Sequence, residues 1–180
     1  MKSHVSCLLV AAVVPILCSV SSAEITESTD HGATIQHRYE INGFVDDVYL
    51  HFERVGTWWS SAHSWSGDSR NMTLTLKPGG AFLEALPNDG FVEHMRVIYV
   101  APQRLVRLKG ALGPFQEKAV DGTMTVRFES ADQKTKITVT YAIGGFLPGG
   151  FTSVAPVVDG VIDEQFHRLK QRVEGTLQTE

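Results

Sequence analysis

Residues 153–175 read SVAPVVDGVIDEQFHRLKQRVEG, and this stretch is the strongest single indication of the fold. Its apolar residues are Val154, Val158, Val161, Ile162, Phe166, Leu169 and Val173. They recur at intervals of three and four, which is the period of an amphipathic helix with one buried face. Ser153 is a candidate N-cap, and Gly175 suits the end of the helix. At 1.5 Å per residue the helix would be about 33 Å long, so it needs an equally long apolar surface to cover it.

Most of the chain before this helix alternates between apolar and polar residues, which is typical of half-buried strands. The turns between the later strands are short, as in KPGG at 77–80 and PNDG at 87–90. Strands joined by such turns pair antiparallel, because parallel pairing needs a long crossover. Residues 24–32 form a polar lead-in without a predicted strand. The predicted strands cover residues 33–41, 72–76, 80–86, 91–100, 104–112, 122–130 and 135–144.

A short helix with a candidate N-cap at Asn42 separates the first strand from the others. Its apolar stripe consists of Val45, Val48, Tyr49, Phe52 and Val55. The predicted fold is therefore α+β, with a curved antiparallel sheet of about six to seven strands wrapped around the long C-terminal helix. One helix rarely fills the concave face of such a sheet, so we expect a pocket between them.

The N-terminal segment has the layout of a cleaved signal peptide. Lys2 is followed by an apolar run from Val5 to Val20, and small residues precede Glu24. The run is too short for a membrane span, so we expect no stable span after cleavage. We predict a signal peptide at residues 1–23, a single domain at 24–180, and an exported protein, periplasmic or secreted. Both cysteines of the chain lie within the predicted signal peptide, which leaves no disulfide or thiolate in the mature domain.

Composition excludes several classes of partner. The chain has a formal net charge of −4, and its basic residues are scattered, so we expect no nucleic acid partner. No pair of histidines has the spacing of metal ligands, and no glycine-rich loop carries the lysine of a nucleotide site. We therefore expect neither a metal nor another cofactor. The sequence does not indicate an oligomeric state.

The loop TWWSSAHSWSGDSRN at 57–71 contains all three tryptophans of the chain. Adjacent residues Trp58 and Trp59 cannot both point into one core from a regular element, so at least one should line or cap a cavity. The alternative is that all three tryptophans plug the open end of the sheet. In the same loop Asp68 could orient His63 as a general base. The other interpretation is that Asp68 only braces the loop by capping backbone amides.

Two glutamates on neighbouring strands are candidates for a buried acid. Strict alternation places Glu93 on the more apolar face of residues 91–100 and His94 on the opposite face. Glu84 has apolar residues on both sides of it in the same way. If both acids face inward, one should keep its proton at neutral pH and could donate it to a carbonyl substrate. Alternatively, they pair with Arg96, Arg107 or Arg127 at the sheet edge.

Several motifs resemble the START-like helix-grip superfamily, also called SRPBCC, and in particular its small exported bacterial members without known function. They are Trp58-Trp59, Ala62-His63, Ser66–Asp68, Gly79-Gly80, Glu93–Val97, Leu112–Gln116 and the helix from Ser153. The superfamily includes polyketide cyclases and aromatases, lipid-transfer domains, the birch-pollen allergen fold and activators of a chaperone ATPase. The resemblance implies a helix-grip fold and covers nearly all of residues 24–180. Phe115 departs from the smaller residue expected there, and the predicted export argues against the role of chaperone activator.

These observations lead to a ligand-binding prediction. We expect a small apolar or amphipathic ligand between the sheet and the C-terminal helix. The predicted ligand-binding residues are Trp58, Trp59, His63, Trp65, Phe82, Glu93, His94, Met95, Gln116 and Tyr141. One alternative is a cyclase, dehydratase or hydrolase that uses His63 or Glu93 in the same cavity. The other is an envelope protein-interaction module, which should have no closed cavity.

Overall fold

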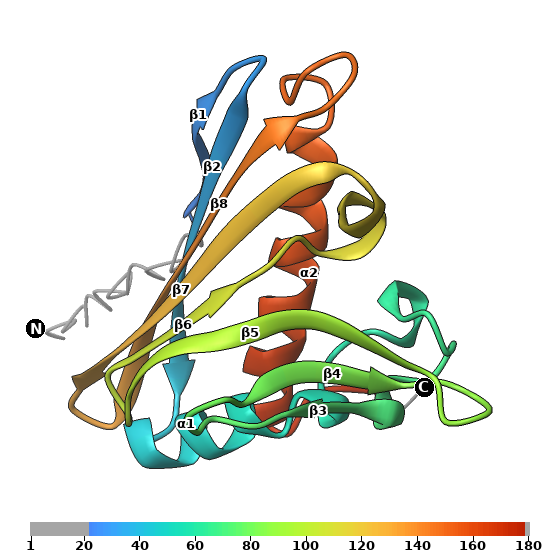
Figure 1. Ribbon diagram of the computed structural model, residues 1–180. Coiled ribbons are helices and arrows are strands. Elements are labelled where there is room, and N and C mark those ends of the chain that lie inside the picture. The colour runs from blue at the N-terminus through green and yellow to red at the C-terminus, as the bar shows by residue number, and fades with distance from the viewer. Residues whose placement is uncertain (1–21, 179–180) are drawn as a thin grey trace, which may run out of the picture.

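The computed structural model describes residues 22–178, which form one curved antiparallel sheet and two α-helices (Figure 1). The sheet has eight strands in the order β1-β2-β8-β7-β6-β5-β4-β3, and its two edges do not meet. The strands are β1 Ser22–Ser28, β2 Gly32–Asn42, β3 Met72–Leu74, β4 Ala81–Ala85, β5 Phe91–Ala101, β6 Leu105–Lys109, β7 Ala119–Ala131 and β8 Lys134–Phe146. The helices are α1 Val45–Glu53 and α2 Ala155–Val173. The predicted fold class is therefore confirmed.

The strand that the sequence analysis omits is β1, at the edge of the sheet. It pairs antiparallel with β2 and contains only one large apolar residue, Ile25. A short polar edge strand depends on main-chain hydrogen bonds and leaves little trace in the hydrophobic pattern. Apart from Ser22 and Ala23, the predicted signal peptide lies outside the described residues.

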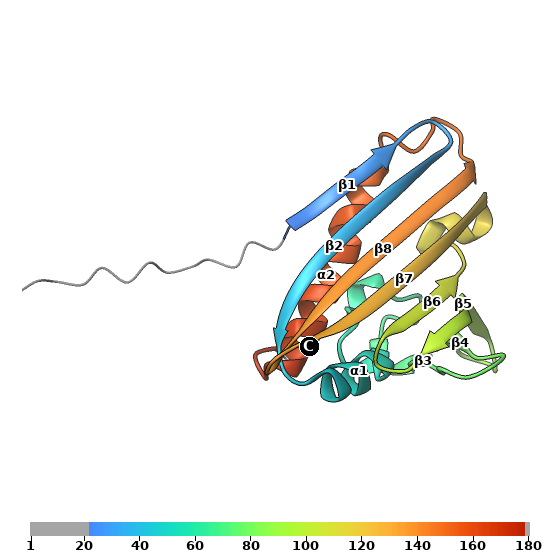
Figure 2. The same ribbon diagram turned by 90° about the vertical axis from the view of Figure 1, so that its left-hand side faces the viewer.

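Helix α2 runs along the concave face of the sheet (Figure 2). The fully buried residues of the predicted stripe are Ile162 in the middle of α2 and Phe166 and Leu169 nearer its C-terminus. The ring of Phe166 lies 5.7 Å from that of Trp58 and 6.4 Å from that of Phe52, in a buried aromatic cluster.

The first turns of α2 differ from the prediction of a fully buried stripe. Val154, Val158 and Val161 are only partly buried, because they face a cavity instead of packed side chains. The stripe therefore lines the cavity in its N-terminal part, up to Ile162, and packs into the core at Phe166 and Leu169.

Polar contacts fasten the other side of α2 to strand β2. The buried His37 ring lies with its Nε2 atom 2.9 Å from Asp159 Oδ1, and the Tyr39 hydroxyl donates to Asp163 Oδ1 over 2.9 Å. The helix is therefore held on the β2 side independently of what fills the cavity.

Both predicted N-caps are wrong, whereas Gly175 directly follows the C-cap residue of α2 with φ +70°, as predicted. Helix α1 has Phe44 at its N-cap position and α2 has Val154, and neither cap is closed by a side-chain hydrogen bond. Asn42 instead donates through its side-chain amide to Glu174 Oε1 over 2.9 Å, which joins the end of β2 to the end of α2. Asn42 therefore hydrogen-bonds a residue distant in the sequence instead of capping the helix that follows it.

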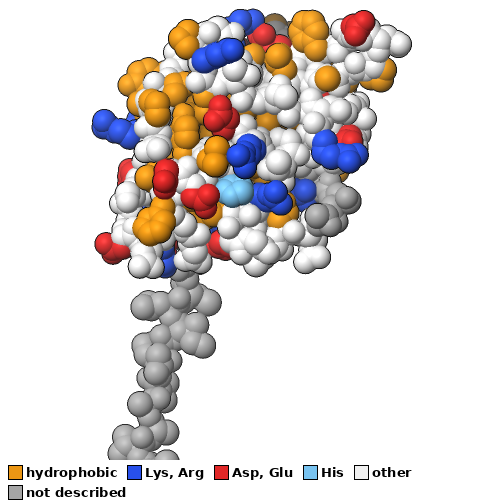
Figure 3. Space-filling model, turned by 90° about the horizontal axis from the view of Figure 1, so that it is seen from below, with side chains coloured by type: hydrophobic (Ala, Val, Ile, Leu, Met, Phe, Trp, Pro, Cys, Tyr) orange, Lys and Arg blue, Asp and Glu red, His pale blue; other side chains and the backbone are white. Residues whose placement is uncertain are grey.

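Charged side chains of both signs lie interspersed on the face seen from below, with hydrophobic side chains between them (Figure 3). Within residues 22–178, neither α1 nor α2 is both long enough and apolar enough to cross a bilayer.

Candidate functional site

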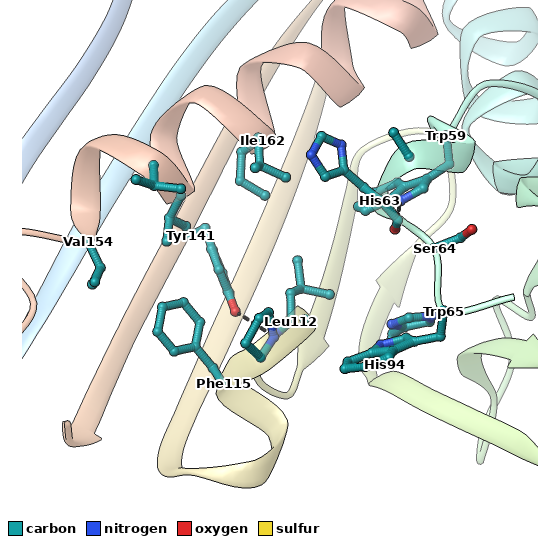
Figure 4. Close-up of a pocket in the computed structure, with 16 residues that line it drawn as sticks. Trp59, His63, Ser64, Trp65, His94, Leu112, Phe115, Tyr141, Val154 and Ile162 are labelled. Atoms are coloured by element: carbon teal, nitrogen blue, oxygen red, sulfur yellow. Dashed lines mark hydrogen bonds between the residues drawn. The ribbon is translucent and has the colours of Figure 1, made fainter. Parts of the chain in front are cut away.

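A cavity of about 540 Å³ lies between the N-terminal half of α2 and the sheet (Figure 4). Its walls come from α2, from the tryptophan-containing loop, from β5 and β8, and from the 3₁₀ segment Gly113–Glu117 with the residue before it. The lining residues are Trp59, Ala62, His63, Ser64, Trp65, His94, Leu112, Gly113, Pro114, Phe115, Tyr141, Val154, Val157, Val158, Val161 and Ile162. The lining is mostly apolar, with a few polar side chains, as in many small-molecule sites.

Five of the ten predicted ligand-binding residues are brought together in this lining: Trp59, His63, Trp65, His94 and Tyr141. Their binding of a ligand stays a prediction. Trp58, Phe82 and Met95 are buried beside the cavity, where they line a second, much smaller void of about 20 Å³. Glu93 and Gln116 lie instead in a shallow depression formed by β5, β6 and the segment after β6. The other five predicted residues therefore do not line this cavity.

The two adjacent tryptophans divide between core and cavity. The Trp58 indole is 1% exposed and donates to the carbonyl oxygen of Phe52 over 3.3 Å. The Trp59 indole donates to the carbonyl oxygen of His63 over 2.9 Å and packs edge-on against Phe82. Trp65 is 55% exposed and stands at the rim. Trp58 therefore fills the core, as one interpretation of the loop predicts, whereas Trp59 and Trp65 border the cavity, as the other predicts.

A β-bulge in β5 overturns the predicted orientation of Glu93. Phe82 of β4 pairs with Met95, and the next residue, Leu83, pairs with Glu93, so His94 is the extra residue. A bulge interrupts strict alternation, and His94 and Met95 are both buried as a result. Glu93 faces outward with its Oε2 atom 2.6 Å from Arg96 Nη2, so the predicted alternative of an arginine partner is correct for this residue.

The buried acid of the site is Glu84, and its partner is His94. The Glu84 side chain is fully buried, and its Oε2 atom lies 2.9 Å from Nε2 of His94. The same carboxylate accepts hydrogen bonds from the backbone N–H groups of Trp65 and Ser66. The predicted pair of glutamates is thus replaced by a pair of glutamate and histidine, which the sequence analysis missed because it assumed strict alternation in β5.

Electrostatics assigns the charges of this pair. Burial alone would raise the pKa of the Glu84 carboxyl group, but the hydrogen bonds from Ser66, Trp65 and His94 hold that pKa below its usual value. Burial lowers the pKa of His94 by more than the nearby Glu84 raises it. At neutral pH Glu84 is therefore ionised and His94 is neutral.

The second cavity histidine, His63, has no contact with Asp68. Asp68 accepts from the backbone N–H of Arg70 over 2.9 Å and pairs with its guanidinium group, so the prediction that it braces the loop is correct. The Nδ1 atom of His63 lies 3.0 Å from Nε2 of Gln165 and 3.6 Å from Glu164 Oε2. Helix α2 therefore orients His63, and the predicted pair of His63 and Asp68 is not formed.

The remaining hydroxyl groups of the lining are engaged within the protein. The Tyr141 hydroxyl accepts from the backbone N–H of Leu112 over 3.1 Å, and burial raises its pKa to about 12 (Figure 4). The Ser64 hydroxyl donates to the carbonyl oxygen of Ser61 over 2.7 Å. The cavity thus offers an apolar volume and two imidazole rings to a ligand.

Several solved structures share this fold at low sequence identity. An uncharacterised protein from Rhizobium leguminosarum has 16% identity and a TM-score of 0.60, over 87% of this chain and 99% of that one. The Aha1 protein of Colwellia psychrerythraea has 14% identity and a TM-score of 0.57, over 81% of this chain and 98% of that one. The di-domain ARO/CYC protein StfQ of the steffimycin biosynthetic pathway has 12% identity and a TM-score of 0.55, over 81% of this chain and 52% of that one.

By sequence, the chain matches a family model but no individual curated protein. The family model described as "Polyketide cyclase / dehydrase and lipid transport" matches residues 32–174, which contain the described chain from β2 to the end of α2. The predicted resemblance to the helix-grip superfamily is confirmed. The chain therefore belongs to the polyketide cyclase/dehydrase and lipid transport family.

Proposed function

We propose that this chain is an exported protein that binds one small apolar or amphipathic molecule between α2 and the sheet. The observation that carries the proposal is the cavity of about 540 Å³ with its valine, leucine, tryptophan and phenylalanine lining. The family supports a ligand-binding or cyclase-type role. The signal-like segment at residues 1–23 supports export. A cavity of this size also disfavours the third predicted class, an interaction module without one.

The apolar lining supplies the driving force for binding. A ligand that buries about 300 Å² of apolar surface gains about 7.5 kcal/mol at about 25 cal/mol per Å². The loss of translational and rotational freedom offsets a large part of that gain. Even without this offset, about 7.5 kcal/mol corresponds to a dissociation constant of about 3 µM, so a ligand without polar matching should bind more weakly than micromolar.

Filling the cavity tests the proposal directly. Val158 lines the cavity from α2, so Val158→Trp should occupy part of its volume and weaken palmitate binding at least about tenfold. Isothermal titration calorimetry with palmitate measures the change. Gln171→Trp places the same side chain at an exposed position of the last turns of α2 and should leave binding unchanged. Equal affinity of both variants and the parent protein would exclude the cavity as the binding site.

An enzyme of the cyclase, dehydratase or hydrolase type is the second candidate, and the pair of Glu84 and His94 favours it. A neutral imidazole oriented by an ionised carboxylate is a typical general base. His94→Gln should lower turnover of a hydrophobic carbonyl substrate by about 10²-fold or more. Glu93→Gln alters the neighbouring but outward-facing acid and should leave the rate unchanged. An unchanged rate in His94→Gln would remove the enzyme hypothesis while leaving ligand binding intact.

A further inference from the structure

Glu84 determines which nitrogen of His94 carries the proton. An ionised carboxylate only accepts hydrogen bonds, so His94 Nε2, 2.9 Å from Glu84 Oε2, must be the protonated nitrogen. The other nitrogen, Nδ1, then has a free lone pair. It has no hydrogen-bond partner within residues 22–178, although the His94 side chain is only 5% exposed. The His94 ring contributes to the cavity lining and also to the depression that contains Glu93 and Gln116, so Nδ1 is the nitrogen of this ring left to accept from a bound molecule.

Gln165 determines the protonation of His63 by a similar chain of contacts. The backbone N–H of Ser60 donates to Gln165 Oε1 over 2.8 Å, which assigns the oxygen and nitrogen of this fully buried amide. The amide nitrogen therefore faces His63 Nδ1 at 3.0 Å and donates to it. Glu164 Oε2 lies 3.6 Å from the same Nδ1 atom, which is beyond hydrogen-bond distance. A neutral His63 must then carry its proton on Nε2. His63 thus presents a donor where His94 presents an acceptor.

The other polar side chains of the lining do not compete for a ligand. The hydroxyl groups of Tyr141 and Ser64 donate to the carbonyl oxygens of Gly110 and Ser61 over 3.5 and 2.7 Å, and the indole N–H of Trp59 donates to that of His63. Trp65 is more than half exposed, so water can satisfy its indole N–H at the rim. One acceptor, on His94, and one donor, on His63, therefore remain in an otherwise apolar cavity (Figure 4).

We propose that the cavity selects an apolar molecule that bears both a hydroxyl or other O–H or N–H donor and a carbonyl or ether oxygen. The donor binds His94 Nδ1, and the acceptor oxygen binds His63 Nε2–H. Glu84 and Gln165 are positioning residues that hold the two imidazoles in these forms without contacting the ligand. This inference rests on the proposed ligand-binding function and names the class of ligand.

Nuclear magnetic resonance tests the tautomers without any ligand. Long-range ¹H–¹⁵N correlation spectra of ring-labelled histidine should assign the neutral forms of His94 and His63 to the Nε2–H tautomer, with His94→Gln and His63→Gln identifying their signals. Glu84→Gln should move the proton of His94 from Nε2 to Nδ1. The shorter contact to Ser66 keeps the new side-chain oxygen on that N–H and turns the new NH₂ group toward His94. A cavity histidine in the Nδ1–H form in the unaltered protein would overturn the proposal.

Matched naphthalene compounds test the recognition itself by calorimetry. We expect 2-naphthol to bind about tenfold more tightly than 2-methoxynaphthalene, because only the naphthol can donate to His94. We expect 2-acetylnaphthalene to exceed its apolar analogue 2-isopropenylnaphthalene by a similar factor, because only the ketone can accept from His63. In Glu84→Gln the preference for naphthol should disappear while the preference for the ketone persists. Glu93→Gln, an exposed acid on β5, should change neither ratio.

The outcomes separate this inference from the function on which it rests. If neither these compounds nor palmitate bind, the proposed function fails. If the compounds bind but both ratios are near one, or if Glu84→Gln keeps the preference for naphthol, the donor and acceptor assignment is wrong while ligand binding stands. Should Glu84→Gln fail to fold, His63→Phe provides an independent test. It should abolish only the preference for the ketone, and retention of that preference would also refute the assignment.

Discussion

At the scale of single residues, the pair of Glu84 and His94 makes stability depend on pH. The pKa of His94 is lower in the folded protein than in the unfolded chain, so between these two values only the unfolded chain binds the proton. The pKa of Glu84 is also depressed on folding, so its contribution is present above the unfolded value and is lost as pH falls through the folded value. Both effects have the same sign, and acid destabilises the fold.

The expected result is a free energy of unfolding that falls as pH drops below about 6.5, where an unperturbed histidine begins to bind its proton. Urea denaturation between pH 7.5 and 4.5 measures this slope. In His94→Gln the slope between about pH 6.5 and 5 should be smaller, because one protonation linked to unfolding has been removed. His51→Gln changes a partly exposed histidine of α1 and serves as the control. Identical slopes in all three proteins would contradict the proposed linkage.

The same pair marks the limit of sequence interpretation for the site. Glu84 was correctly suspected as a buried acid because apolar residues flank it. Both His94 and Glu93 are predicted as binding residues although alternation places them on opposite faces, since nothing in FVEHMRVIYV indicates the bulge that buries His94 and leaves Glu93 outside. The conformation of the bulge depends on how β4 and β5 pair, and pairing is a tertiary property. Hydrogen bonds such as that between Gln165 and His63 span 102 residues and leave no local pattern.

At the scale of elements, the part of α2 that borders the cavity contains Gly160 on its exposed side. Glycine inside a helix lowers its stability relative to alanine by roughly 0.5–1 kcal/mol. A Cβ atom at Gly160 would meet no atom within 4 Å, because the position faces solvent. This glycine therefore has no steric reason to be there.

Gly160→Ala should accordingly raise the free energy of unfolding by about 0.5–1 kcal/mol. Thermal and urea denaturation check the gain, and palmitate affinity should not change, since position 160 does not line the cavity. Gly122→Ala is the contrasting substitution. Its Cβ would lie 2.8 Å from the Tyr141 ring, so a loss of stability is expected there. A destabilised Gly160→Ala protein would show that the helix is strained in a way that the contacts do not reveal.

Elements were predicted well where the hydrophobic pattern is strong and poorly where it is weak. The long helix and the strands from β2 to β8 have clear periods of 3.6 and 2. Strand β1 lacks such a pattern because its residues are mostly polar and it lies at an edge. The N-caps failed for a different reason. Asn42 is bound by Glu174, which is 132 residues away in the chain.

At the scale of the whole molecule, the cavity means that a guest should stabilise the fold. A molecule that binds only the folded state at 100 times its dissociation constant adds about 2.7 kcal/mol to the free energy of unfolding. For a domain of this size that corresponds to a rise in Tm of about 5–10 °C. Differential scanning calorimetry with increasing palmitate measures the rise. The Tm of Val158→Trp should respond much less, and an equal response would place the bound lipid elsewhere.

The presence of a pocket followed from the sequence, because a single amphipathic helix on a curved sheet seldom fills it. Its place along α2 did not follow. The core closes around Phe166 and Trp58, whereas Val154 and Val158 face open space. That division depends on the summed volumes of side chains from several distant elements, which no window of sequence contains.

The position of the rim loop and the protonation of Glu84 are coupled, because the backbone N–H groups of Trp65 and Ser66 both donate to the Glu84 carboxylate. If the loop swings outward to admit a molecule, it takes those two donors away, and the abandoned carboxylate then holds a proton more tightly. Opening therefore costs less in acid than in neutral solution. The rates at which a molecule enters and leaves the cavity should therefore depend on pH.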